Sequence, residues 1–275
     1  MPAIDDLRDL LERQLGTIER TSDGVREGSD PEDLHRFRVA VRRTRALIRA
    51  SRPLVRDQLA PLDRDLRWLG SATGPVRDLD VLIEHLRELE PELEPDRVGA
   101  RAIIAALELE RLRRRDVLIT ALDAIRYREL LRRFSEVLPT LEAAAPDVSL
   151  EHLARKELDR LRDDYAALGA DPLDDDVHAI RIRAKHARYA AELAAMASGD
   201  RFTELADALA DVQDVIGVHQ DAHVAEERVR EVAADESFVA AGRIAEIERG
   251  RRKRARNELP EAMREVERRA AAAFR

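Results

Sequence analysis

The 275-residue sequence contains no cysteine. Disulfide frameworks, zinc ribbons, iron–sulfur sites and thiol catalysis are therefore excluded, and a reducing compartment is the natural setting. Aromatic residues make up only 3%, and there are just 11 glycines and 11 prolines. Strand and turn formers are thus scarce while helix formers abound, which excludes all-β and βαβ folds. We expect an all-α fold.

Long apolar runs are also missing. No stretch reaches the 18 apolar residues that a membrane-spanning helix needs. The start of the chain reads as an amphipathic helix with acids in its first turn, without the basic and apolar segments of a signal peptide. We expect a cytoplasmic protein with no membrane partner.

Lysine is rare, because all but three of the 48 basic residues are arginine. The formal net charge is nevertheless −8, since acids outnumber bases. This global acidity argues against non-specific coating of nucleic acid. Any polyanion site must come from a local concentration of arginine.

Two parts of the chain resemble each other in an ungapped alignment, which indicates two copies of one helical unit. We expect these copies at 1–145 and 146–275, divided near the Ala-Ala-Ala-Pro-Asp stretch at 143–147. The aligned pairs include Leu7 with Leu150, Leu15 with Leu158, His35 with His178, Arg38 with Arg181, Gly74 with Gly217 and Asp78 with Asp221.

Apolar periodicity, with proline and glycine as stop signals, predicts the helices. Breaks are expected at Gly70, Gly74-Pro75 and Pro91 to Pro95, and Pro260 is expected to kink or divide the last helix. Two four-helix bundles packed about a pseudo-twofold axis are the simplest architecture. The predicted helices are at about 3–20, 31–51, 54–73, 76–90, 97–122 and 126–143, then 149–168, 174–197, 200–215, 218–234 and 237–272.

The helix beginning near Pro31 carries a basic stripe. At about 100° per residue, His35, Arg38, Arg42, Arg45 and Arg49 fall within an arc of roughly 80°, bordered by apolar residues on both sides. No acid lies along it, so its arginines repel one another by a few tenths of a kcal/mol per pair. The second copy repeats the stripe with His178, Arg181, Lys185 and Arg188.

Three interpretations of the stripes remain open. They could be solvated helix faces, or they could be internally salt-bridged, and we expect Asp78 and Asp221 to pair with one or two of their basic groups. They could also bind an anion, because the planar fork of arginine suits phosphate and a ladder of such forks suits a repeating polyanion. Tyr189 is the only aromatic residue beside either stripe, so no specific nucleic-acid partner is expected.

These residues resemble the signature of the CHAD family, the conserved histidine α-helical domain. The likeness rests on His35-Arg36-Phe37-Arg38-Val39 and His178-Ala179-Ile180-Arg181-Ile182 with the basic residues that follow each, and on Arg77-Asp78-Leu79-Asp80-Val81. The resemblance implies two four-helix bundles that bind inorganic polyphosphate through basic residues lining a central cavity. Carried over, the binding residues are His35, Arg38, Arg42, Arg43, Arg45, His178, Arg181, Lys185 and Arg188, with Arg49 added on geometry.

Two further basic runs, at 111–115 and 249–256, are typical of solvated helix faces as much as of an anion site. Their near-equivalence in the repeat favours Arg111 and Arg254 as contributors to the cavity. His186 departs from the family pattern and is expected to be peripheral. The Glu-x-Glu-x-Lys motif of the triphosphatase domain that is fused to some members of the family does not occur here.

We therefore expect a stand-alone binding module without catalysis or cofactor, located with polyphosphate granules. The main alternative is a metal-dependent phosphohydrolase using His219, His223, Asp78 and Asp80, but this ligand set is not repeated in the two copies. A salt-bridged scaffold that binds nothing is the other alternative. Gly70-Ser71-Ala72-Thr73-Gly74 lacks the lysine of a phosphate loop and is expected to be an interhelical turn.

Overall fold

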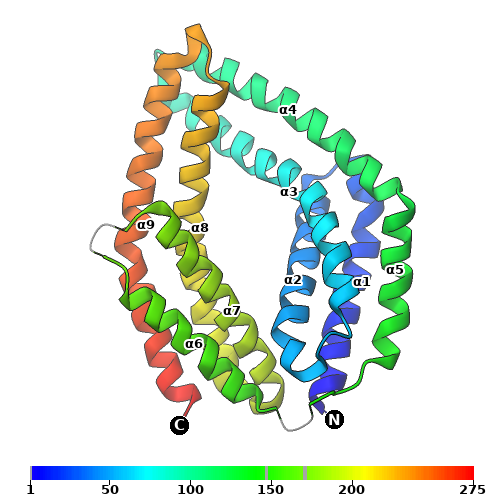
Figure 1. Cartoon of the computed structure of the whole chain (residues 1–275). Coiled ribbons are helices and arrows are strands. Elements are labelled where there is room, and N and C mark those ends of the chain that lie inside the picture. Colours follow the sequence, from blue (N-terminus) through cyan, green and yellow to red (C-terminus); the bar gives the residue numbers. More distant parts are fainter. Residues whose placement is uncertain (1, 146–147, 170–171) are drawn as a thin grey trace. The chain divides into compact units, whose positions relative to one another are not determined.

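The computed structural model describes residues 2–145, 148–169 and 172–275. Every regular element in these ranges is helical, which confirms the all-α prediction (Figure 1). The chain divides into two compact units, one of residues 1–94 and 100–146, the other of residues 95–99 and 147–275. Each unit is described by itself below.

In the first unit, α1 (Pro2–Glu27) packs on α2 (Pro31–Val55), α2 packs on α3 (Ala60–Leu89), and α3 packs on α5 (Ile125–Val137). α4 (Arg97–Asp123) joins α3 to α5, after a short 3₁₀ helix at Glu90–Leu93, and a second one at Leu138–Thr140 follows α5. Fully buried Phe37, Leu66 and Phe134 come from three of these helices, so one apolar core holds the unit together.

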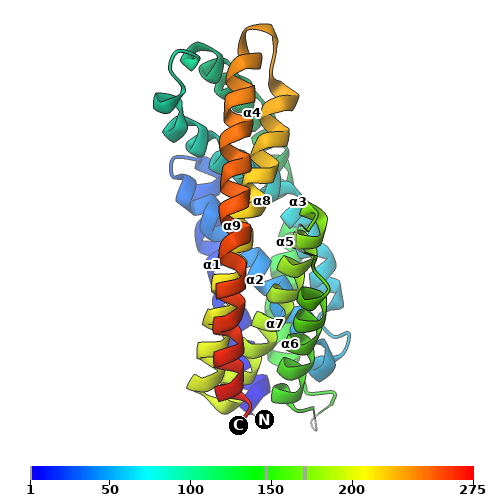
Figure 2. The same ribbon diagram turned by 90° about the vertical axis from the view of Figure 1, so that its left-hand side faces the viewer.

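In the second unit, α6 (Leu150–Ala166), α7 (Asp174–Ser198), α8 (Asp200–Val232) and α9 (Phe238–Ala273) pack in chain order. A 3₁₀ helix at Asp235–Ser237 links α8 to α9, which lie side by side in both Figure 1 and Figure 2. Leu158, Ala184, Val212 and Ala245 are fully buried, one from each helix. This succession of antiparallel neighbours is typical of helical bundles.

The predicted helix breaks are wrong in two places. The predicted helices at 54–73 and 76–90 form one helix, α3, which continues through Gly70, Gly74 and Pro75. The predicted helices at 200–215 and 218–234 likewise form α8. Burial explains this, because Ala72, Thr73 and Val76 are buried around the expected break and their packing outweighs the local cost of glycine and proline.

Smaller corrections concern helix ends. α1 extends to Glu27 instead of ending near 20, and the helix predicted to reach 143 ends at Val137. Pro260 lies inside α9 without dividing it. In the ranges that the structure describes, no helix is both long enough and apolar enough to cross a membrane. The pseudo-twofold relation remains a prediction.

Candidate anion-binding site

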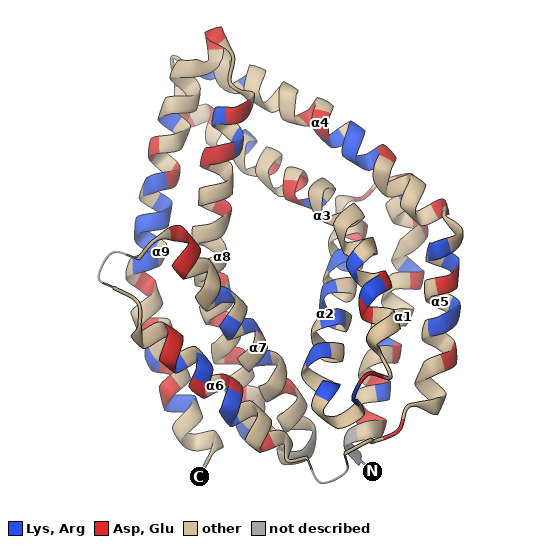
Figure 3. Cartoon of the chain, viewed as in Figure 1, with Lys and Arg blue, Asp and Glu red and all other residues tan. Residues whose placement is uncertain are grey.

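The first basic stripe lies along α2, and we call His35, Arg38, Arg42, Arg45 and Arg49 the α2 row. Asp30 caps the N-terminus of α2, because its side chain accepts a hydrogen bond from the Glu32 amide at 2.9 Å, and Pro31 is the first helical residue. The opposite side of the helix is buried through apolar residues such as Phe37 and Leu47. This burial fixes the rotation of α2, so the α2 row lies on the other side of the helix. Figure 3 shows basic residues along the length of α2.

α3 supplies carboxylates to part of the α2 row. Asp63 Oδ1 lies 3.1 Å from Arg45 Nε, and Asp63 Oδ2 lies 3.6 Å from Arg49 Nε and 3.7 Å from Arg67 Nη2. A single, mostly buried carboxylate is therefore shared by three guanidinium groups. Positive charge remains in excess along this part of α2.

The expected pairing of Asp78 with the stripe is confirmed. Arg38 Nη2 donates to Asp78 Oδ1 at 2.9 Å, and the aspartate side chain is 61% exposed. An ion pair this exposed contributes about 0–1 kcal/mol. A stronger anion could therefore displace Asp78 at little cost.

Arg42 and His35 are the two members of the α2 row that take part in none of these ion pairs. Arg42 is exposed and His35 is half-buried, and neither has a hydrogen-bond or ion-pair partner among the residues that the structure describes. Arg43, one residue off the row, is half-buried. Arg42 thus carries a positive charge that no described residue compensates.

Two glycines of α3 leave space for these guanidinium groups. A Cβ on Gly74 would lie 2.7 Å from Arg38 Nη1, which is closer than such contacts occur, whereas a Cβ on Gly70 would lie 3.9 Å from Arg45 Nη1. In the second unit, a Cβ on Gly217 would lie 4.0 Å from Arg181 Nη2. The segment expected to be an interhelical turn is instead a helix face against which the arginines of α2 lie.

The second stripe lies on α7, and we call His178, Arg181, Lys185 and Arg188 the α7 row. His178 Nδ1 is 3.0 Å from Gln220 Oε1 of α8. Arg188 Nε is 3.0 Å from Glu192 Oε1 on its own helix, and its guanidinium lies 5.5 Å from the centre of the Tyr189 ring. Arg181 and Lys185 are half-buried. Compared with the α2 row, more of the α7 row is already engaged within the fold.

Two arginines of the basic run at 111–115 have different roles. Arg111 forms an ion pair with Asp80, whose side chain is 8% exposed, and both line a cavity of about 680 Å³ together with Arg77. Arg115 instead donates to the carbonyl oxygens of Val25 at 3.1 Å and Arg26 at 2.6 Å. It therefore caps the C-terminus of α1, where a cation is favoured.

The basic residues of the run at 249–256 also differ in their contacts. Arg254 is exposed and has no ion-pair partner among the described residues. Its neighbours turn toward α7, where Arg252 Nη1 lies 2.5 Å and Arg256 Nη2 2.6 Å from the two oxygens of Asp174. Participation of Arg254 in anion binding remains a prediction.

The histidines of the metal hypothesis lie in this same network. His219 Nε2 accepts a hydrogen bond from Arg256 Nε at 3.0 Å, and His223 Nδ1 lies 3.2 Å from Arg252 Nη1. Burial, and then the charge of Arg256, lowers the pKa of His219 to about 4. Within the described part of the chain, no three His, Asp or Glu side chains are grouped so as to hold a metal ion.

Two carboxylates of the site were not anticipated from the sequence. Asp63 on α3 and Asp174 at the start of α7 organise the arginines around them. Asp63 gives no local signal because its partners lie on another helix. Asp174 does stand in the acidic first turn of a predicted helix, but the sequence does not show that α9 lies opposite.

Comparisons with known proteins find relatives in sequence and solved structures with a similar fold. The uncharacterized proteins MT2285 and Rv2226 of Mycobacterium tuberculosis are each 28% identical to this chain over an alignment of 256 residues. The alignment covers 85% of this chain and 48% of each relative, so the chain spans about half of their length. PptA from Streptomyces chartreusis has a similar fold, with a TM-score of 0.76 and 21% identity over 96% of this chain and 100% of that one.

A second solved structure carries the family name. The CHAD domain from the plant Ricinus communis has a TM-score of 0.63 and 26% identity, over 98% of this chain and 91% of that one. The family model of the CHAD domain matches residues 9–230, which include both basic rows. The chain therefore belongs to the CHAD domain family.

Proposed function

We propose that this chain binds inorganic polyphosphate through the α2 row and the α7 row, and does not cleave it. Membership of the CHAD family supports a polyphosphate-related role at the level of the family. The observation that carries the proposal for this chain is the α2 row itself. Arg45, Arg49 and Arg67 share the single carboxylate of Asp63, and Arg42 has no partner in the described residues.

The spacing of the α2 row suits a long, repetitive anion. Residues four apart on a helix are separated by about 6 Å along its axis, so successive guanidinium groups present a ladder of donors. Charge-assisted hydrogen bonds to phosphate oxygens are roughly twice as strong as neutral ones, and arginine makes them in pairs. A single orthophosphate would contact only part of this ladder, and a chain of phosphates would contact all of it.

The α7 row is the weaker of the two proposed binding surfaces. Arg188 would have to exchange Glu192 for the ligand, and His178 would have to leave Gln220. Each exchange offsets part of the gain from a new phosphate contact. The α2 row, with Arg42 already available, supplies more of the affinity.

The absence of catalysis is part of the proposal. The cluster of His219, His223 and Asp174 contains carboxylate and imidazole groups, but Arg252 and Arg256 are bound among them. A hydrolase would need such a group to hold a metal ion or to activate water. Metal-stimulated release of phosphate from polyphosphate, lost on replacing His223 or Asp80, would contradict this part.

Titration calorimetry with long-chain polyphosphate at about 150 mM salt tests the proposal, with orthophosphate and single-stranded RNA as comparators. We expect tight binding of polyphosphate alone, weakened at least about tenfold by the Arg42→Ala/Lys185→Ala pair. Arg13→Ala/Lys156→Ala is the matched control, because both residues are exposed and neither has an ion-pair partner in the described ranges. It should bind like the unmodified protein.

The single replacements separate the two rows. Arg42→Ala should weaken binding more than Arg188→Ala, whose guanidinium is already paired. Equal affinity for RNA would reduce the site to a general polyanion surface. Unchanged binding in the Arg42→Ala/Lys185→Ala protein would contradict the location of the site. A cytoplasmic position beside polyphosphate granules belongs to the same proposal and is tested by imaging the tagged protein with stained granules.

A further inference from the structure

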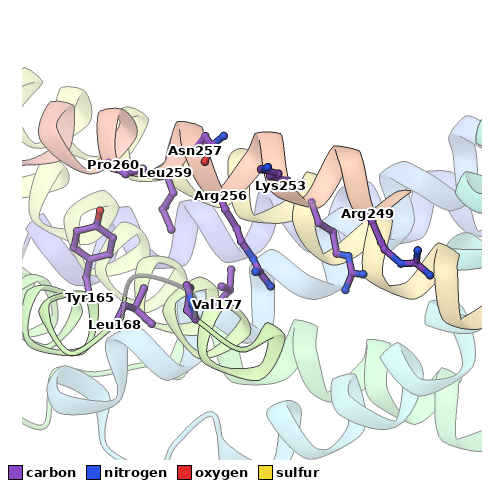
Figure 4. Close-up of a pocket in the computed structure, with 12 residues that line it drawn as sticks. Tyr165, Leu168, Val177, Arg249, Lys253, Arg256, Asn257, Leu259 and Pro260 are labelled. Atoms are coloured by element: carbon purple, nitrogen blue, oxygen red, sulfur yellow. The ribbon is translucent and has the colours of Figure 1, made fainter. Parts of the chain in front are cut away.

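The second unit contains a cavity that neither basic row lines. It has a volume of about 890 Å³ and lies between α9, the end of α6 and the start of α7 (Figure 4). Cavities of this size hold small organic ligands. Val177, which lines it, is one residue from His178 and therefore about 100° around α7 from the α7 row.

One end of the cavity is cationic. Arg249, Arg252, Lys253 and Arg256 line it at the i, i+3, i+4 and i+7 positions of α9. Asp174 holds Arg252 and Arg256, and Glu226 accepts from Arg249 Nε at 3.1 Å. These acids fix the three guanidinium groups in place, so their remaining donors are held in position before any ligand arrives.

Lys253 supplies the charge that is not compensated. Its side chain is exposed, and it has no ion-pair partner among the residues that the structure describes. It is one of only three lysines in the chain. An ammonium group on a flexible stem beside fixed guanidinium groups is suited to the terminal oxygens of a phosphate.

The other end of the cavity is apolar. Figure 4 shows the Tyr165 ring, Leu168, Leu259 and Pro260 together at this end, away from Lys253 and Arg249. Burial raises the pKa of Tyr165, so its hydroxyl stays protonated, and the hydroxyl has no hydrogen-bond partner in the described residues. The aromatic face can contact a flat ring, and the hydroxyl can donate to a polar group at its edge.

We propose that this cavity binds a phosphorylated organic molecule of nucleotide size. The phosphate contacts Lys253 and Arg256, and the ring lies against Tyr165, Leu259 and Pro260. A bare phosphate chain would leave the apolar end unused, and a wholly apolar ligand would make no contact with the cationic end. The site is independent of polyphosphate binding by the α2 row and the α7 row.

Titration calorimetry with ADP tests this site, with orthophosphate and adenosine as the two halves of the probe. We expect ADP to bind at least about tenfold more tightly than either half, because only ADP contacts both ends of the cavity. Lys253→Ala should weaken ADP binding about tenfold. Lys156→Ala, which removes an exposed lysine of α6 outside the cavity, should leave it unchanged.

Three results would overturn the proposal. The first is no ADP binding at millimolar concentrations, and the second is ADP binding no tighter than orthophosphate. The third is ADP binding that survives Lys253→Ala or is lost in Lys185→Ala, since either would place ADP on the α7 row or elsewhere. Polyphosphate binding measured on the same Lys253→Ala protein should be unchanged, which separates this proposal from the function proposed above.

Discussion

The acceptor groups around an arginine decide what that arginine does in this chain. Arg115 caps a helix, Arg111 is paired with the buried Asp80, and Arg256 is held by Asp174. Arg42 has none of these partners in the described part of the chain. Because almost all cations are arginine, the residue type alone carries little information about function, and the contacts carry most of it.

His219 is a titratable residue whose side chain is almost wholly buried. Its side chain is 1% exposed, its Nε2 accepts from Arg256, and its Nδ1 is buried without a hydrogen-bond partner in the described residues. The neutral imidazole is therefore favoured in the folded chain, with a pKa of about 4 instead of 6.5. In the unfolded chain the pKa is ordinary, so between these values the unfolded chain binds more protons.

The free energy of unfolding should fall on acidification for this reason. The stabilisation is complete above about pH 6.5 and is lost progressively as the pH falls toward 4. Between pH 7 and pH 5 we expect a loss on the order of 1–2 kcal/mol in urea unfolding. His219→Gln keeps an acceptor for Arg256 but does not titrate, so this variant should lose clearly less. An equal loss in both proteins would show that His219 is not the cause.

At the level of the helix, the glycines of α3 show why the local sequence wrongly predicted a break between two helices. Gly70 and Gly74-Pro75 have the composition of a turn, yet α3 continues through them because the surrounding residues are buried. Gly74 is explained by a contact with another helix, since it leaves space for the guanidinium of Arg38. In a single sequence, a glycine that a turn requires cannot be distinguished from a glycine that close packing between helices requires.

Replacing the two glycines tests this explanation. Gly70→Ala adds a methyl group at ordinary contact distance and should stabilise α3 by about 0.5–1 kcal/mol through helix propensity. Gly74→Ala should gain clearly less, because its methyl group would displace Arg38 from Asp78. Thermal and urea unfolding of both variants measure the difference. Equal stabilisation would contradict a role for Gly74 in placing Arg38.

Periodicity predicted which residues share one face of a helix. It did not predict which residues of different helices contact each other. The α2 row follows from the alternating three- and four-residue spacing of its members, and the start of α2 follows from Asp30-Pro31. Asp63 and Asp174 could not be predicted as partners, because their arginines lie on other helices. The cavity beside α9 depends on the same unseen contacts between helices.

At the scale of the whole molecule, a net charge of −8 opposes any approaching polyanion. At about 150 mM salt this repulsion is screened beyond roughly 8 Å, so local charges decide binding. A row of arginines with too few carboxylates is such a local charge. The chain spans about half the length of its curated relatives, and both basic rows lie inside the part that matches the CHAD family.

The central claim is that the α2 row faces a ligand and is not an internal scaffold, and Arg42→Glu tests it most directly. The replacement removes no ion pair seen in the described structure, and the new glutamate would stand four residues from Arg38. Polyphosphate affinity and urea unfolding are measured on the same protein. We predict an affinity loss of roughly 100-fold with stability within about 0.5 kcal/mol of the unmodified chain. Unchanged affinity with a stability loss above about 1 kcal/mol would contradict the account and favour a salt-bridged scaffold.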